Sequence, residues 1–185
     1  MRIIAGEYRG RVITAPSSKF TRPMTDRVRE TLFNILNNLI DFDGITVLDI
    51  YSGSGALGLE SLSRGAASVH FVEKNFPVRQ VLEQNIASLK AEDKCRIFSM
   101  EALRFSDLNK SEKYDLILAD PPFFHDDIYS VVRNLLSNKV INENNFMIIE
   151  RSIQTKDKDE ENFGLPAFKK IGDALLYRID ASATI

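Results

Sequence analysis

The stretch that decides the fold is "VLDIYSGSGALGLE", Val47 to Glu60, in which an apolar run through Asp49 is followed by three glycines. The run predicts a buried strand, and the apolar residues beyond the glycines predict the start of a helix. Gly53, Gly55 and Gly58 have the G-x-G-x-x-G spacing of a dinucleotide-binding loop. The glycine spacing alone therefore does not distinguish a nicotinamide cofactor from other nucleoside ligands.

The carboxylate of Asp49 narrows the choice of ligand. An acid so close to a pyrophosphate would repel it, which disfavours a nicotinamide oxidoreductase. S-adenosylmethionine carries an amino acid and a sulfonium in place of phosphates, and glycines allow the backbone to pass close to it. We expect S-adenosylmethionine as the cofactor, in contact with Asp49, Ser52, Gly53 and Gly55.

Two further acids follow later predicted strands. Glu73 ends "VHFVEK", where a carboxylate accepts both ribose hydroxyls of a bound nucleoside. Glu101 lies in "MEAL" after the third strand, where it faces the adenine. A solvated strand-end acid is the alternative for each residue, and Glu73 would serve NAD equally well.

The second motif is "YDLILADPPFF", Tyr114 to Phe124, a strand that ends at Asp120 before two prolines and an aromatic residue. The prolines restrict their own φ and the residues before them, so the motif is a stiff bracket. Such a bracket suits methylation of an exocyclic amino group, because Asp120 and a backbone carbonyl accept its two N–H bonds and orient the nitrogen. An aromatic ring then stacks on the base, which must be unpaired or flipped out. The predicted catalytic residues are Asp120, Pro121, Pro122 and Phe123.

The rest of the chain alternates strand and helix patterns, which predicts an α/β fold with a mostly parallel sheet. In such a sheet the first and fourth strands lie side by side, so Asp120 approaches the glycine loop. Predicted strands cover 45–50, 67–73, 95–100, 114–119 and 145–151, and predicted helices cover 55–64, 76–90 and 126–138.

The two ends of the chain have different patterns. Residues 2–14 predict a short β-hairpin, and residues 21–39 predict a helix capped by Thr25 or Asp26. Residues 168–180 predict a second hairpin around Gly172. Before it, residues 154–164 are predicted to be a charged, mobile loop.

Charge is unevenly distributed along the chain. Residues 1–30 hold seven basic and three acidic residues, a net +4, while the whole chain has a net charge of −2. This asymmetry indicates a polyanion partner, with a solvated basic surface as the alternative. Guanidinium groups suit bidentate phosphate contacts. The predicted RNA-binding residues are Arg9, Arg11, Arg22, Arg27 and Arg29.

Composition disfavours several other chemistries. The single cysteine, Cys95, cannot form an intramolecular disulfide, and its place in a predicted strand disfavours a nucleophile of the cytosine-C5 type. Two histidines, His70 and His125, do not indicate a metal site, so no metal is expected. No apolar run has the length of a membrane helix and no secretory signal opens the chain, so we expect a soluble, cytoplasmic, monomeric protein that does not bind membranes.

The quoted motifs resemble a known family. "LDIYSGSGALGLESLSRGA" and "DPPF" resemble Rossmann-like class I S-adenosylmethionine methyltransferases that act on amino groups. "MRIIAGEYRGRVITAP", "TRPMTDRVRETLFNIL" and "KKIGDALLYRI" resemble the RsmD family, the bacterial small-subunit (16S) ribosomal RNA guanine-N2 methyltransferases. The resemblance implies a seven-stranded sheet with a reversed last strand, a C-terminal antiparallel hairpin and an N-terminal extension for RNA. It also implies cofactor contacts at Asp49, Gly53, Gly55 and Glu73, and a guanine held by residues 120–123.

The resulting hypothesis is an rRNA guanine-N2 methyltransferase whose partner is ribosomal RNA or the small ribosomal subunit. Residues 1–40 form the RNA-binding extension, a hairpin and a helix, and residues 41–185 form the methyltransferase domain. One alternative is an adenine amino-methyltransferase of the same fold, because "DPPF" does not specify the ring. The other is a non-catalytic RNA-binding module that keeps a relict cofactor loop.

Overall fold

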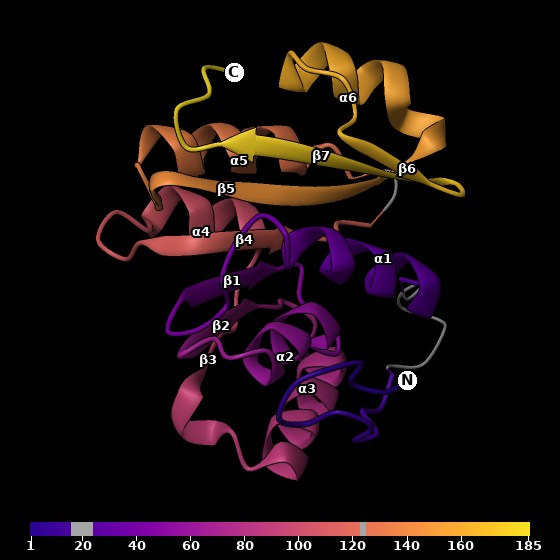
Figure 1. The fold of residues 1–185 in the computed structure, drawn as a ribbon. Coiled ribbons are helices and arrows are strands. Elements are labelled where there is room, and N and C mark those ends of the chain that lie inside the picture. The colour runs from indigo at the N-terminus through magenta and orange to yellow at the C-terminus, as the bar shows by residue number, and fades with distance from the viewer. Residues whose placement is uncertain (16–23, 123–124) are drawn as a thin grey trace.

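The structure is a computed structural model that describes residues 1–15, 24–122 and 125–185. Within these residues, seven strands form one sheet in the order β3-β2-β1-β4-β5-β7-β6 (Figure 1). The first five strands are parallel, β7 is antiparallel to β5, and β6 is antiparallel to β7. The predicted parallel sheet and C-terminal hairpin are therefore confirmed. The strands are β1 (Thr46–Ile50), β2 (Ser68–Val72), β3 (Cys95–Phe98), β4 (Tyr114–Ala119), β5 (Ile141–Ser152), β6 (Lys169–Ile171) and β7 (Ala174–Asp180).

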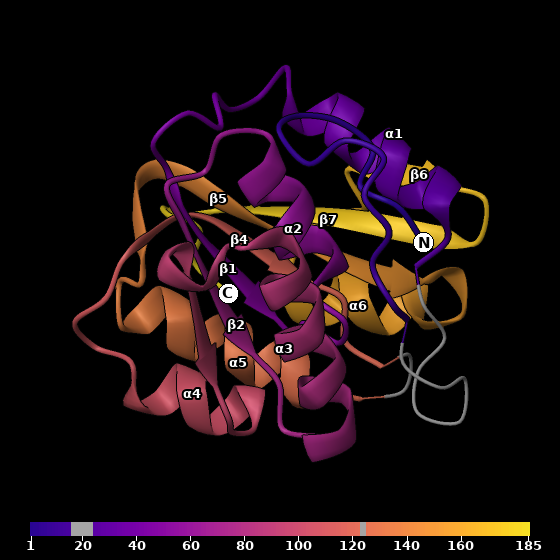
Figure 2. The same cartoon turned by 90° about the horizontal axis from the view of Figure 1, so that it is seen from below.

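Helices cover both faces of the sheet. The first three helices and the N-terminal segment bury their apolar side chains on one face, and the last three helices cover the other (Figure 2). No helix in the described ranges is long and apolar enough to cross a membrane. The helices are α1 (Asp26–Leu36), α2 (Ala56–Ser63), α3 (Phe76–Leu89), α4 (Ala102–Leu108), α5 (Asp127–Ser137) and α6 (Lys156–Phe163), with single 3₁₀ turns at Glu92–Lys94 and Ile153–Thr155.

The central strands are apolar on both sides because each side meets a helical layer. Successive side chains of a strand point to opposite faces. Thus Leu116 and Leu118 of β4 join the layer under α1–α3, while Ile117 joins the layer under α4–α6. Helix α1 begins as predicted, since the Thr25 hydroxyl accepts the Val28 N–H at 3.3 Å.

The predicted N-terminal hairpin is reduced to a single antiparallel bridge between Arg2 and Val12. The backbone of this segment pairs both with itself and with α2: the Ile3 N–H donates to the Arg11 carbonyl at 3.0 Å, and the Ile13 N–H donates to the Met1 carbonyl at 3.1 Å. The carboxylate of Glu60 accepts the N–H groups of Ile4 and Ala5, at 2.7 and 3.1 Å. The predicted short antiparallel pairing of residues 2–14 is therefore present, but it forms no strand ladder, and the Glu60 carboxylate of α2 satisfies N–H groups between its two arms.

The prediction of a mobile loop at residues 154–164 is wrong, because the segment forms a 3₁₀ turn and helix α6. Asp159 and Phe163 of α6 are 0% and 1% exposed. The partner of Asp159 is Arg151 of β5, eight residues earlier. A tertiary ion pair of this kind leaves no mark in the local charge pattern. Helix α4 is a further element that the sequence reading missed.

We expect Glu60→Gln to lower the free energy of unfolding by about 3 kcal/mol. The Glu60 carboxylate is fully buried, accepts two backbone N–H groups and lies 2.8 Å from the Arg64 guanidinium. The glutamine amide turns an N–H₂ group toward one of these donors and removes the countercharge of Arg64.

Urea denaturation measures this loss. The matched control is Glu83→Gln, since Glu83 also pairs with an arginine on its own helix but is 54% exposed. The control should change the free energy of unfolding by less than about 0.5 kcal/mol. Equal losses in the two variants would contradict the anchoring role of Glu60.

Candidate functional site

The two sequence motifs meet at one cavity of about 770 Å³. Strand β1 pairs with β4 in parallel, with Asp49 opposite Leu118, so the carboxyl ends of both strands reach the same edge of the sheet. This pairing confirms the predicted approach of Asp120 to the glycine loop. The predicted cofactor-binding and catalytic residues that line the cavity are Asp49, Ser52, Gly53, Glu73, Glu101, Asp120, Pro121 and Pro122.

The three glycines of the loop have different physical roles. Gly53 has a φ of +55°, and a Cβ there would meet only one backbone oxygen, at 4.0 Å. It therefore leaves open space for a ligand. A Cβ on Gly55 would lie 2.4 Å from a Leu82 methyl group, and a Cβ on Gly58 would lie 2.4 Å from the Phe71 ring. Gly55 and Gly58 thus allow α2 to pack closely on α3 and β2. Ser54 and Ala56, on either side of Gly55, line the cavity, and the cofactor contact of Gly55 stays a prediction.

Asp49 is 1% exposed and holds the start of α2. Its Oδ2 accepts the Gly58 N–H at 2.8 Å. Burial raises the pKa of Asp49 well above its ordinary value, and the negative charges of Asp120 and Glu73 raise it further, while the Gly58 hydrogen bond opposes them. A cation beside Asp49 would favour its ionised form.

Glu73 closes the glycine loop from the end of β2. Its two oxygens accept the Gly53 N–H at 3.0 Å and the Asn75 N–H at 2.7 Å. Burial raises the pKa of Glu73, and these hydrogen bonds partly oppose the rise. Each carboxylate oxygen retains a second lone pair for a hydroxyl donor.

Ser52 and Glu101 differ from each other in exposure. The Ser52 hydroxyl is buried and donates to the Val72 carbonyl at 3.3 Å, so it already has a partner inside the protein. Glu101 is exposed at the rim of the cavity, 3.3 Å from the Lys74 ammonium group. Its carboxylate is therefore free to turn toward a ligand.

Asp120 follows β4, and its two prolines also line the cavity. Burial raises the pKa of its carboxyl group, while the charge of Arg151 lowers it. The predicted ring of Phe123 lies outside the described residues. The bracket therefore presents an acceptor side chain to the same space that the glycine loop borders.

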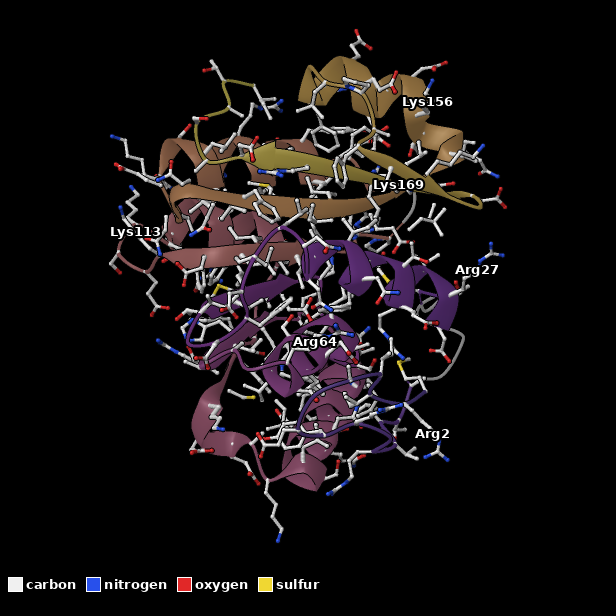
Figure 3. All side chains as sticks on the ribbon, viewed as in Figure 1. Arg2, Arg27, Arg64, Lys113, Lys156 and Lys169 are labelled. Atoms are coloured by element: carbon white, nitrogen blue, oxygen red, sulfur yellow. The ribbon has the colours of Figure 1, made fainter. Side chains whose placement is uncertain are left out.

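The predicted RNA-binding arginines lie in different environments. Arg9, Arg11 and Arg27 are exposed, and Arg11 donates to the Ser88 carbonyl of α3 at 2.5 Å. Arg22 lies outside the described residues. Figure 3 shows Arg2 and Arg27 on one side of the molecule and Lys113 on the opposite side.

Arg29 differs from the exposed phosphate contact that the sequence predicts. It is 2% exposed, lines the cavity, and donates to the Arg2 carbonyl at 2.6 Å and to Asp26 at 2.9 Å. The spacing of Arg29 from Leu32 and Phe33 places it on the apolar stripe of α1. That spacing was the signal that this arginine faces inward.

Sequence reasoning missed Asn85, which links the N-terminal segment to the glycine loop. This 2% exposed side chain accepts the Thr14 N–H at 2.8 Å. Its amide donates to the carbonyls of Thr14 and Ser54, both at 2.9 Å. No local pattern marks Asn85 as special, because all its partners are distant in sequence.

Comparisons with known proteins agree with this geometry. The family model "Conserved hypothetical protein 95" matches residues 1–179. The chain is 36% identical to ribosomal RNA small subunit methyltransferase D of Escherichia coli, over 97% of this chain and 88% of that protein. The solved structure of the E. coli protein yhhF has a TM-score of 0.79 at 32% identity, covering 97% of this chain and 98% of that chain. A Thermus thermophilus protein has the same fold, with a TM-score of 0.80 at 23% identity, covering 97% of this chain and 99% of that one.

We expect Asp49→Asn to stabilise the ligand-free protein near neutral pH. Because the pKa of Asp49 is raised in the folded state, its proton contributes stability that is present below about pH 4 and lost as the pH rises toward the folded-state value. Asparagine keeps an oxygen for the Gly58 N–H and does not ionise.

Urea denaturation across a pH series measures the effect. The variant and the wild type should differ little near pH 3, and the advantage of the variant should widen as the pH rises. If the free energy of unfolding of the wild type instead rose relative to that of the variant as the pH increased, the fold would stabilise the ionised Asp49 carboxylate, and the prediction would be wrong.

Proposed function

The chain belongs to the conserved hypothetical protein 95 family, the RsmD family, and from that membership we propose that it methylates the N2 amino group of a guanine in 16S ribosomal RNA with S-adenosylmethionine as donor. The observation that carries the proposal is the single cavity shared by the acidic glycine loop and the Asp120–Pro121–Pro122 bracket. One motif suits a cationic nucleoside and the other suits an amino group on a flat ring.

The residues of the cavity fit S-adenosylmethionine. When bound, this cofactor supplies an electrophilic methyl group on a sulfonium. Its ammonium and sulfonium charges match a wall that contains Asp49 and Glu73, where a pyrophosphate would meet repulsion. Glu73 accepts ribose hydroxyls, the open space at Gly53 admits the ligand, and Glu101 lies at the rim for the adenine.

Asp120 and the bracket orient the acceptor. The lone pair of an exocyclic amino nitrogen is delocalised into the ring, so alignment and charge stabilisation matter more than nucleophilicity. Asp120 and the Pro121 carbonyl accept the two N–H bonds, and the carboxylate stabilises the positive charge that develops on nitrogen. Pro122 stiffens the bracket, and Phe123 stacks on the base.

The N-terminal residues 1–40 supply RNA binding, and residues 41–185 supply methyl transfer. The +4 charge of residues 1–30 supports this division. Glu60 and Asn85 fix the segment to α2 and to the cavity wall, so RNA bound there is held next to the bracket. The proposed RNA contacts are Arg9, Arg11 and Arg27, which are exposed, together with Arg22, which the sequence predicts.

Radiolabelled methyl transfer to unmodified small ribosomal subunits, followed by nucleoside analysis, tests the activity. We expect label in N2-methylguanosine. Asp120→Ala should lower the transfer rate about a hundredfold or more while S-adenosylmethionine affinity, measured by calorimetry, stays near that of the wild type. Label in N6-methyladenosine, or no label with the wild type, would overturn the proposal.

Binding titrations at several salt concentrations test the RNA surface. If Arg9, Arg11, Arg22 and Arg27 meet phosphates of unpaired RNA, log affinity should fall with log salt at a slope of about −3, and Arg9→Glu with Arg11→Glu should reduce the slope to about −1.5. Lys110→Glu with Lys113→Glu is the matched control, because Lys113 lies on the side opposite Arg27 (Figure 3). Equal slopes in the two double variants would exclude the docking role.

A further inference from the structure

Behind the bracket, Arg151 near the end of β5 carries a buried positive charge. Its side chain is 1% exposed. Its Nε donates to Asp159 of α6 at 2.9 Å, and its Nη1 donates to the backbone carbonyl of His125 at 3.4 Å. Its Nη2 is buried and has no hydrogen-bond partner in the part of the chain that the structure describes.

Three side chains hold this arginine in place. Asp159 is fully buried and accepts hydrogen bonds from Tyr129 and Thr155, both at 2.6 Å, as well as from Arg151. A buried ion pair adds little stability over apolar residues of the same size. Stability alone therefore does not account for a charged network at this place, and its neighbours suggest another role.

The first neighbour is Asp120. Ala119 of β4 is paired with Ile149 of β5, so the next residues on the two strands, Asp120 and Glu150, are adjacent. Arg151 follows Glu150 on the opposite face of the sheet. The guanidinium lowers the pKa of Asp120 and so opposes the effect of burial.

Glu150 is the second buried carboxyl group next to Asp120. Glu150 is 7% exposed, and its Oε2 has no partner among the described residues. Burial raises the pKa of Glu150, and the negative charge of Asp120 raises it further. Two buried carboxyl groups side by side do not both ionise readily, and a nearby cation decides which one does.

The second neighbour is the backbone that leaves the bracket. The His125 N–H donates to the Pro122 carbonyl at 3.0 Å, and the His125 carbonyl accepts from Arg151. Arg151 therefore contacts the chain just beyond the prolines while its charge acts on the carboxylate before them.

We propose that Arg151, locked by Asp159, is a positioning residue for methyl transfer: it holds the turn that follows the bracket and places a permanent positive charge close to the adjacent carboxyl groups of Asp120 and Glu150. The proposal rests on the amino-methyltransferase function proposed above. The acidic and basic side chains that line the cavity with Asp120 are Arg29, Asp49, Glu73, Lys74, Glu101, His125 and Asp127, and Glu150 and Arg151 lie on the neighbouring strand. Arg151 is the cation whose charge lowers the pKa of Asp120, so its removal should raise that pKa.

The test is the pH dependence of methyl transfer, together with an NMR titration of the Asp120 carboxyl group in the cofactor-free protein. Arg151→Gln should move the acid midpoint upward by about one pH unit, a tenfold change in proton affinity. Arg151→Lys keeps the charge and should keep the midpoint. Asp159→Asn removes the partner that partly neutralises Arg151, so its midpoint should move downward.

The control is Asp115→Asn at the other end of β4, where Asp115 accepts the Thr46 N–H at 2.9 Å. It should leave the midpoint unchanged. If Arg151 and Asp159 contribute only to stability, Arg151→Gln and Asp159→Asn should lower the melting temperature without moving the acid midpoint, and that result would overturn the proposal. If Arg151→Gln does not fold, the Asp159→Asn variant tests the proposal alone: an unchanged acid midpoint in that variant would overturn it.

The NMR titration needs no RNA, so the two proposals fail separately. An Asp120 titration that is unmoved in a folded Arg151→Gln variant rejects the positioning role even where the wild type transfers methyl groups. Absent methyl transfer by the wild type rejects the proposed function, whatever the titration shows.

Discussion

The parallel pairing of β1 with β4 is the constraint on which the site depends. Parallel strands place their carboxyl ends at the same edge, and this pair joins segments about seventy residues apart in sequence. The pairing sets the glycine loop beside the proline bracket. A chain in which β1 and β4 were separated by another strand would keep both motifs and lose the common cavity.

That cavity concentrates buried acid. Asp49, Glu73 and Asp120 share its wall, and Glu150 is adjacent to Asp120 on the neighbouring strand. Each carboxylate costs desolvation free energy, and the fold offsets part of the cost with the N–H groups of Gly53, Gly58 and Asn75. A positively charged ligand, such as the proposed S-adenosylmethionine, would offset a further part of this cost.

The N-terminal segment is integrated into the same core as the methyltransferase sheet. Ile3, Tyr8 and Ile13 share an apolar layer with α1 and α2, and the Glu60 and Asn85 side chains satisfy backbone groups of the segment. A basic segment fixed in this way presents its exposed arginines at a constant position relative to the bracket. If these arginines bind RNA as proposed, this preorganisation lowers the entropic cost of placing one base beside the bracket.

The sequence alone determined the parallel sheet, the C-terminal hairpin and the two motifs, because strand patterns, glycines and prolines act through local backbone geometry. Only the tertiary structure decided that Gly55 packs against Leu82, and that backbone N–H groups of the N-terminal segment bond to side chains of α2. It alone also turned the charged segment at 154–164 into a helix whose Asp159 holds Arg151. The physical reason is that close packing and the free energy of buried polar groups depend on partners that folding brings from other parts of the chain, and no local pattern records these partners.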